Sequence, residues 1–187
     1  MEPLKEMFNE AFFKNFTEVF KKSYKGFNAA GFYKDVIDKL DTRTLNERLR
    51  HTSIVLHKYL PADFKRAIGI MKDAAAGLKH GYTALVYPDY VGLYGKDDIS
   101  TSLEALKYFT VFGSSEFAIR EFIRLDAERT ISEMEKWTHD SNQHVRRLAS
   151  EGSRPRLPWS FKLDAIIKTP TLTEKYFHAL KPMTTFM

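Results

Sequence analysis

Apolar side chains recur every three or four residues along most of the chain, as they do on the buried face of an α-helix. Three clear runs are Leu4, Phe8, Phe12, Phe16, Val19 and Phe20; Leu45, Leu49, Leu56 and Leu60; and Leu103, Leu106 and Phe109. The strict alternation of apolar and polar positions that marks a half-buried strand is hard to find. The pattern therefore predicts an all-α protein.

Capping boxes mark several helix starts independently of this spacing. In such a box a threonine hydroxyl accepts hydrogen bonds from the first free amides, and a glutamate three residues later reaches back to the threonine. The pairs are Thr44 with Glu47, Thr101 with Glu104, and Thr171 with Glu174. With the spacing, they predict helices over residues 3–22, 29–40, 44–59, 62–75, 100–112, 114–126, 127–138, 141–151, 158–168 and 172–181.

The connections between these helices are mostly short, and short connections force neighbouring helices to run antiparallel. We therefore expect one domain over residues 1–187, a HEAT-like solenoid of about five antiparallel helix pairs. The exception is the stretch 76–98, which contains glycines, tyrosines and Pro88. A connection of that length usually packs as an ordered loop, so a long ordered loop is expected there.

Composition narrows the classes of protein that the chain can represent. Its 187 residues, 43% of them hydrophobic, suffice for a real core, and no apolar run reaches 18 residues. Charges in the first ten residues argue against a signal peptide, so we expect a cytoplasmic protein without a membrane segment. The absence of cysteine excludes disulfides and thiolate chemistry, and the six histidines lack metal-ligand spacing. No metal and no cofactor are expected.

The net charge of +5 is concentrated near the C-terminal end. Residues 142–168 hold six basic side chains against two acids, a local charge of +4, which leaves +1 for the other 160 residues. A concentrated basic patch favours a polyanionic partner, whereas the same charge spread evenly indicates only solubility.

The first part of this patch, Asn142 to Gly152, is expected to form a short helix with Arg146 and Arg147 off its apolar face and Gly152 as a left-handed cap. Glu151 is out of place, because an acid in the last turn opposes the helix dipole. One explanation is a salt bridge to Arg147 or Arg154. The other is a carboxylate held beside bound DNA and kept ionised by surrounding arginines.

The next segment, Ser153-Arg-Pro-Arg-Leu-Pro-Trp159, presents Arg154 and Arg156 on a stretch stiffened by two prolines. Guanidinium groups match phosphate geometry, and a stiff loop loses less entropy when it grips a strand. Two simpler explanations remain open: Pro158 suits a helix start, and Trp159 suits a core position.

Glu116 is the third residue of the run Ser114-Ser-Glu-Phe-Ala-Ile-Arg120. A cap by Ser114 and an ion pair with Arg120 at i+4 explain an acid there without any function. Yet its helical position lies between apolar side chains. A partly buried carboxylate is a candidate for chemistry.

These segments together, with Trp137, resemble the AlkC-type DNA alkylation repair glycosylases. The run from His144 to Trp159 carries the likeness most specifically, and Glu116-Phe-Ala-Ile-Arg120 supports it. Residues 3–9 and 45–61 also look like the N-terminal part of that family, so the likeness spans nearly the whole chain.

The resemblance implies a HEAT-like solenoid that holds double-stranded DNA and excises cationic alkylated bases such as 3-methyladenine, without metal or cofactor. By motif position it places Glu116 and Glu151 as catalytic acids near the lesion. It places Trp159 as an aromatic at the same surface. The arginines Arg146, Arg147, Arg154 and Arg156 are expected to contact the DNA backbone.

Family members continue into further repeats with an Asn-His-Leu-Asn-Asp-like segment that supplies another acid, and nothing after Lys181 resembles it. We therefore expect the family's C-terminal repeats to be missing from this sequence, and the chain to bind DNA while releasing bases very slowly. The alternative is a non-catalytic helical scaffold for DNA or for a protein partner. The two differ in whether Glu116 and Glu151 share one groove with Arg154 and Trp159.

Overall fold

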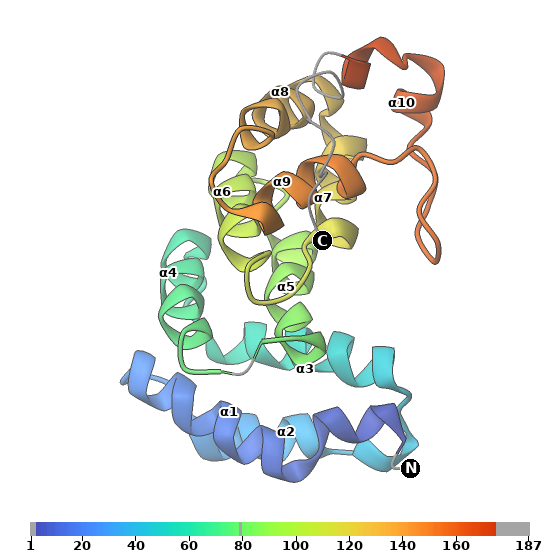
Figure 1. The fold of residues 1–187 in the computed structure, drawn as a ribbon. Coiled ribbons are helices and arrows are strands. Elements are labelled where there is room, and N and C mark those ends of the chain that lie inside the picture. Colours follow the sequence, from blue (N-terminus) through green and yellow to red (C-terminus); the bar gives the residue numbers. More distant parts are fainter. Residues whose placement is uncertain (1–2, 79, 175–187) are drawn as a thin grey trace, which may run out of the picture.

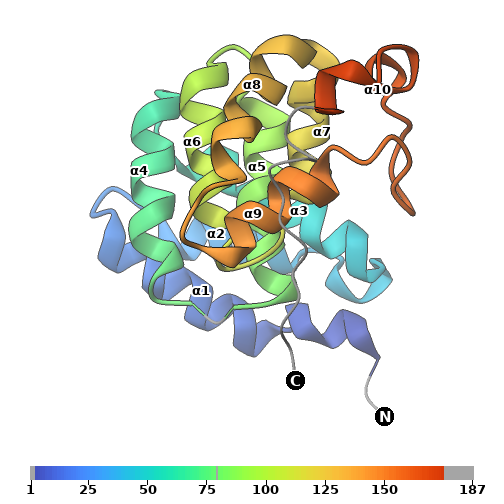
Figure 2. The ribbon, with the colours of Figure 1, turned by 45° about the horizontal axis from the view of Figure 1, so that its top comes forward.

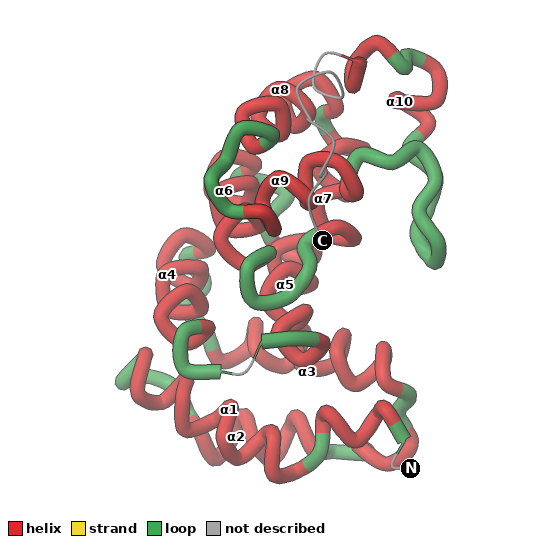
Figure 3. Tube along the Cα trace, viewed as in Figure 1, coloured by secondary structure: helices red, strands yellow, loops and turns green. Residues whose placement is uncertain are grey.

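The regular structure of this chain, a computed structural model that describes residues 3–78 and 80–174, is entirely helical within those ranges (Figures 1 and 3). The ten α-helices are α1 (Glu10–Ser23), α2 (Ala29–Ile37), α3 (Leu45–Tyr59), α4 (Phe64–Ala75), α5 (Val86–Tyr94), α6 (Ile99–Phe109), α7 (Glu116–Leu125), α8 (Ala127–Trp137), α9 (Gln143–Gly152) and α10 (Asp164–Lys168). Three short 3-10 helices, η1 (Leu4–Phe8), η2 (Leu40–Thr42) and η3 (Tyr82–Leu85), complete them. The predicted all-α class is confirmed.

Consecutive helices pack as pairs, and the pairs stack into two rows. Helix α1 packs on α2, α5 on α6, and α7 on α8. One row is formed by the successive contacts of α3, α5, α7 and α9, while α4 and α6 contact each other in the second row, which α8 continues in Figure 1. A continuous core between the rows is what stacked helical repeats require, because no single pair buries its own apolar face.

The first pair is held by phenylalanines spaced three or four residues apart. Phe13, Phe16 and Phe20 of α1 and Phe32 of α2 are at most 1% exposed. Phe16 stacks on Phe20 with ring centroids 4.6 Å apart and on Phe32 at 5.6 Å. Offset aromatic pairs of this kind add to the stabilisation from buried area, so the terminal pair is firmly joined.

The long ordered loop predicted over 76–98 is wrong, because this stretch contains η3 and the whole of α5. Helix α5 lies inside the stack, in contact with α3, α6 and α7. Its proline, Pro88, is the third residue of the helix, where its missing N–H is not needed for an intrahelical bond. The extra helix shifts the expected pairing by one helix from this point onward.

Two of the predicted capping boxes are tested by the described helices. Thr44 and Glu47 form the predicted box, with the Thr44 amide donating to the Glu47 carboxylate at 2.8 Å. The box at Thr101 is wrong: α6 begins earlier, and Asp98 caps it by accepting from the Thr101 amide at 3.0 Å. The third box, at Thr171, belongs to the helix predicted over 172–181, most of which lies outside the described residues.

The helix predicted over 158–168 is mostly loop. After α9 the chain runs without a helix through residues 153–163, then forms the short α10, and is helical again from residue 171 to the last described residue, 174. Both ribbon views show this loop projecting clear of the helices (Figures 1 and 2). Within the part of the chain that the structure describes, α9 packs on both α7 and α8, after the contacting pairs α1 with α2, α5 with α6 and α7 with α8.

Gly152 does not form the predicted left-handed cap. It is the last residue of α9, and Gly81 is the described glycine with a positive φ. A Cβ added at Gly152 would lie 2.6 Å from Cγ2 of Ile119 in α7. The missing side chain therefore allows α9 to approach α7 closely.

This close approach predicts opposite effects for two glycine substitutions. Gly152→Ala should lower the free energy of unfolding by about 1–3 kcal/mol, because the branched Ile119 side chain has little room to turn away. Gly69→Ala in α4, where an added Cβ meets nothing within 4 Å, should instead stabilise by about 0.5–1 kcal/mol. Thermal melting of both variants checks this, and equal shifts would show that α7 and α9 are not in tight contact.

None of the described helices is long and apolar enough to cross a membrane.

Candidate nucleic-acid interface

The contact between α7 and α9 brings together the two acids singled out in the sequence. Glu116 is the first residue of α7, and Glu151 lies in the last turn of α9. Two arginines lie with them: Arg147 on the preceding turn of α9 and Arg154 just after its end. We call these four side chains the charge cluster.

Glu116 is nearly buried, with 8% of its surface exposed, and its carboxylate pairs with the Arg147 guanidinium. Burial raises the pKa of Glu116, and the charge of Arg147 and a hydrogen bond with Ser114 oppose that rise only in part. The expected pair with Arg120 is wrong, because that guanidinium lies elsewhere. The backbone amide of Glu116 donates to the Ser114 hydroxyl at 3.2 Å, but the residue at the N-cap of α7 is Ser115 and not Ser114 as predicted.

Glu151 pairs with Arg154, at 3.2 Å between Oε1 and a guanidinium nitrogen. Of the two salt bridges considered for this residue, the structure therefore contains the one to Arg154. The Glu151 charge also raises the pKa of Glu116, while Arg154 lowers it. The two acids are thus electrostatically coupled, and each has an arginine that is itself about half exposed.

The other two predicted arginines differ in their surroundings. Arg146 donates to the backbone carbonyls of Asp140 at 2.7 Å and Ser141 at 2.9 Å, so its guanidinium stabilises the turn before α9. Arg156 is exposed on the projecting loop. In this arrangement Arg156 is free to meet a phosphate without breaking a described contact, and Arg146 is not.

Trp159 lies at the tip of the loop and is 99% exposed, so the alternative that it belongs to the core is wrong. Pro158 and Trp159 are the central residues of a turn that the Ser160 amide closes by donating to the Leu157 carbonyl at 3.1 Å. Trp159 has φ +61°, as the third residue of a type II turn requires. That position normally holds glycine, and a bulky residue there costs on the order of 1 kcal/mol or more. The other tryptophan, Trp137, is buried in the core.

Arg120 also belongs to this region, although no sequence motif indicates it. Its guanidinium is fully buried and donates to the carbonyls of Gly152 at 3.2 Å and Arg154 at 2.6 Å, and to that of Phe161. These acceptors lie 32 to 41 residues away in the sequence, so no local sequence pattern could predict that Arg120 binds them. A lone arginine on an otherwise apolar helix face was the one available signal.

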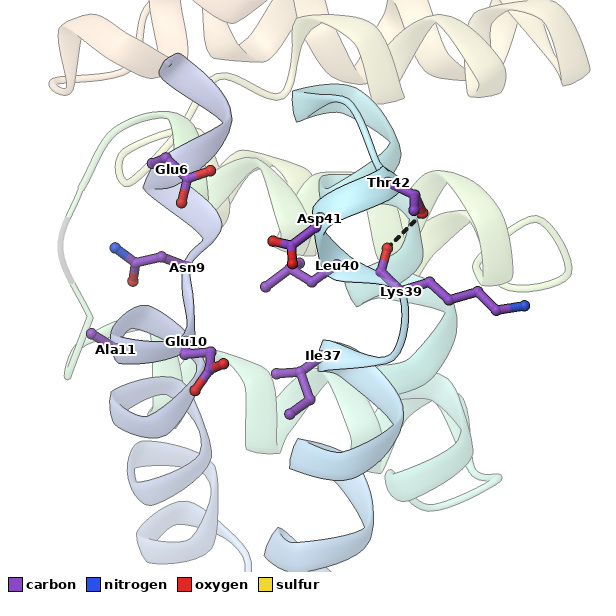
Figure 4. Close-up of a pocket in the computed structure, with 9 residues that line it drawn as sticks. All are labelled: Glu6, Asn9, Glu10, Ala11, Ile37, Lys39, Leu40, Asp41 and Thr42. Carbon is purple, nitrogen blue, oxygen red and sulfur yellow. Dashed lines mark hydrogen bonds between the residues drawn. The ribbon is translucent and has the colours of Figure 1, made fainter. Parts of the chain in front are cut away.

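A hollow lies between the start of α1 and η2, away from the charge cluster (Figure 4). It has a volume of about 630 Å³. Glu6, Glu10 and Asp41 lie along it, and the Lys39 side chain points away from it in the figure. An acidic hollow repels phosphate, so it is unsuited to a nucleic-acid backbone.

The fold and this surface define a helical-repeat protein with a basic, aromatic-tipped loop beside two coupled carboxylates. No protein-family model matches the chain. It is similar to an uncharacterised protein of Bacillus subtilis, YhaZ, with 38% identity over 172 residues, which are 91% of this chain and 48% of the relative.

Among solved structures, the chain is similar to the alkylpurine DNA glycosylase AlkC of Pseudomonas fluorescens bound to DNA containing an abasic site analogue. The TM-score is 0.91 and the identity 40%, over 99% of this chain and 52% of the other. The predicted resemblance to AlkC-type proteins is therefore confirmed in sequence and in fold. The chain spans about half the length of both proteins.

The raised pKa of Glu116 predicts a pH-dependent effect of Glu116→Gln. A carboxyl whose pKa is raised by folding favours the folded state when protonated, so the parent protein loses this contribution as the pH rises from about 4 to 7. The neutral amide loses nothing over that range, and the melting temperature of the variant relative to the parent should therefore increase with pH.

Glu128→Gln, which removes an exposed carboxylate in the first turn of α8, is the control for the loss of one charge. A melting-temperature difference that falls with pH for Glu116→Gln would mean that its ion pair with Arg147 outweighs its burial.

Proposed function

We propose that the chain acts in DNA alkylation repair, within a glycosylase that excises cationic alkylated bases such as 3-methyladenine from double-stranded DNA. The similarity to AlkC supports this function, and the charge cluster carries it. Glu116 and Glu151 lie together beside a loop that presents Arg154, Arg156 and Trp159.

The basic side chains of this region suit the DNA backbone. Arg147 and Arg154 keep about half of their side-chain surface exposed while paired, and Arg156 is exposed on the loop. Arginine binds phosphate through two parallel hydrogen bonds, and exposed ion pairs contribute little stability. At Arg154, whose partner Glu151 is itself partly exposed, exchanging the carboxylate for a phosphate therefore costs the protein little.

The carboxylates suit the chemistry of base release. An alkylated purine such as 3-methyladenine carries a positive charge in DNA. When its bond to C1′ breaks, the bond electrons stay with the base, which leaves neutral, and the positive charge passes to the sugar. Carboxylates stabilise such a cation, as in glycoside hydrolysis, and water then attacks C1′ and gives up a proton. Burial raises the pKa of Glu116, and a higher pKa makes its carboxylate a stronger proton acceptor.

Trp159 supplies an exposed apolar surface at the tip of the loop that follows Glu151. Its exposed indole at a strained backbone position is the kind of local cost that accompanies a binding role. Aromatic side chains stack on bases without regard to sequence, which suits an enzyme that finds lesions in any context.

A non-catalytic scaffold is the second candidate function. The complete pairing of Glu116 with Arg147 and of Glu151 with Arg154 favours it, because a purely structural cluster has the same pairs. The two functions predict different affinities for DNA with a positive charge at the abasic site: a glycosylase site should bind it more tightly than neutral DNA, and a scaffold should not.

DNA binding through the loop predicts a change in salt dependence. The Arg154→Ala, Arg156→Ala double variant should bind duplex DNA more weakly, and the slope of log K against log salt should become shallower by about 2, since each phosphate contact contributes about 0.9. The control is Lys21→Ala, Lys22→Ala, which removes the same charge from exposed positions in the last turn of α1. Fluorescence anisotropy across a salt series measures both, and equal slopes for the two double variants would place the DNA elsewhere.

Stabilisation of a sugar cation predicts a preference among abasic-site analogues. The chain should bind duplex DNA with a cationic pyrrolidine at the lesion at least about tenfold more tightly than DNA with a neutral tetrahydrofuran, because carboxylates attract the charge. Glu116→Gln, Glu151→Gln should abolish this ratio.

Glu128→Gln, Glu135→Gln on the exposed face of α8 removes the same charge and should keep the ratio. Equal affinity of the parent chain for both analogues would favour the scaffold.

A further inference from the structure

We propose that Arg120 is the positioning residue of the loop formed by residues 153–163: it holds both ends of the loop so that Arg154, Arg156 and Trp159 are presented to DNA in a fixed arrangement. The contacts of Arg120 carry the positioning role. The DNA-binding consequence rests on the function proposed above.

Arg120 reaches the two ends of the loop with a single guanidinium. Its Nη1 donates to the carbonyls of Gly152 and Arg154, where the loop leaves α9. Its Nη2 donates to the carbonyl of Phe161, where the loop returns. The Leu163 amide closes the base by donating to the Pro155 carbonyl at 3.0 Å.

The aromatic ring of Phe161 reinforces this base. The Arg120 guanidinium lies 5.5 Å from the ring centroid and that of Arg124, one turn further along α7, lies at 4.5 Å. Both distances are in the range of a cation–π interaction. Two arginines of α7 therefore contact Phe161, in the segment of the loop that leads back to α10.

The guanidinium group is required for this arrangement. Its donors are fixed in one planar fork and can serve acceptors on both sides, whereas a lysine ammonium is a single point charge on a flexible stem. The Arg120 guanidinium thus links carbonyl oxygens at the two ends of the loop through one rigid group. Lysine at this position preserves the charge and loses the link.

A second buried arginine provides a comparison within the same chain. Arg48 of α3 is 1% exposed and donates to the carbonyls of Leu40, Lys5 and Phe8 at 3.0–3.1 Å, and it also pairs with Glu6 at 3.3 Å. Arg120 has no acidic partner within ion-pair distance among the described residues. Its positive charge is therefore uncompensated beneath the loop, where it favours an approaching phosphate.

The tip of the loop needs such a base. Trp159 holds a backbone conformation that costs free energy, and its indole makes no contribution to the core. If the ends of the loop were free, the backbone at Trp159 would relax to an unstrained conformation. The loop would then lose conformational entropy when DNA orders it. Fixing both ends at Arg120 removes that cost in advance.

Limited proteolysis tests the positioning role without DNA. Trypsin can cleave this loop at Arg156–Leu157 and at Lys162–Leu163, and it leaves Arg154–Pro155 uncut because of the proline, so the cut at Arg156 is followed by the mass of its fragments. Arg120→Lys and Arg120→Met should raise the native-state cleavage rate at Arg156 by about tenfold or more, through local opening that does not depend on denaturant. Arg48→Lys is the matched control, because it removes the same kind of buried guanidinium from the distant end of the molecule.

DNA binding then tests the consequence. Arg120→Lys should weaken duplex binding about three- to tenfold while the salt slope stays that of the parent, because Arg154 and Arg156 still reach phosphate after the loop is reordered. A merely destabilised protein behaves as Arg48→Lys does, with neither selective cleavage at Arg156 nor a change in affinity of the folded fraction.

The outcomes separate the two proposals. If the cleavage rate at Arg156 rises equally in Arg120→Lys and Arg48→Lys, once unfolding free energies are matched, the positioning role of Arg120 is overturned. If cleavage rises selectively in the Arg120 variants and affinity for DNA does not change, Arg120 positions the loop, and the DNA-binding role proposed for the loop is overturned.

Discussion

The close contact between α7 and α9 is the constraint on which the candidate site depends. Without a side chain at Gly152, the end of α9 lies directly against Ile119. That approach brings the Gly152 carbonyl to Arg120, and it brings Arg147 to Glu116. A wider spacing of these two helices would remove both the charge cluster and the contacts of Arg120 with the loop.

At this contact, burial raises the pKa of Glu116 and the neighbouring arginine charge lowers it. The two acids also differ in how deeply they are buried. Glu116 is nearly buried, and the loss of solvation raises its pKa in spite of Arg147. Glu151 is more exposed and pairs with Arg154 at the helix end. Two neighbouring carboxylates in different environments are a common way for one site to provide both a proton acceptor and a stabilising charge. Here the difference arises from their places on α7 and α9.

The sequence was sufficient to predict the helical class and the segments that form the site, because helical spacing and local motifs are short-range properties. Helix α5 was missed for a physical reason: Val86, Tyr87, Tyr90 and Val91 are buried on several sides, so the helix lacks the polar face that reveals a period. Its Gly92, which is typical of a loop, lies within the helix and faces Ala118 of α7. The burial of α5 results from its packing against several other helices. It therefore produces no periodic pattern of apolar and polar residues in the local sequence.

The loop before α10 was mispredicted for a different reason. Pro158 and the following residues suit a helix start in isolation, and the local signals were read correctly. The competing interactions come from α7, since Arg120 takes carbonyls on both sides of the loop. Backbone carbonyls bound by a guanidinium are held in place for that donor, so the chain keeps an open turn where its own sequence permits a helix. Long-range donors of this kind decide local structure wherever a buried charge lacks an acidic partner, because the charge must then be solvated by the backbone. The exposed Trp159 and the two arginines of the loop are placed by that requirement.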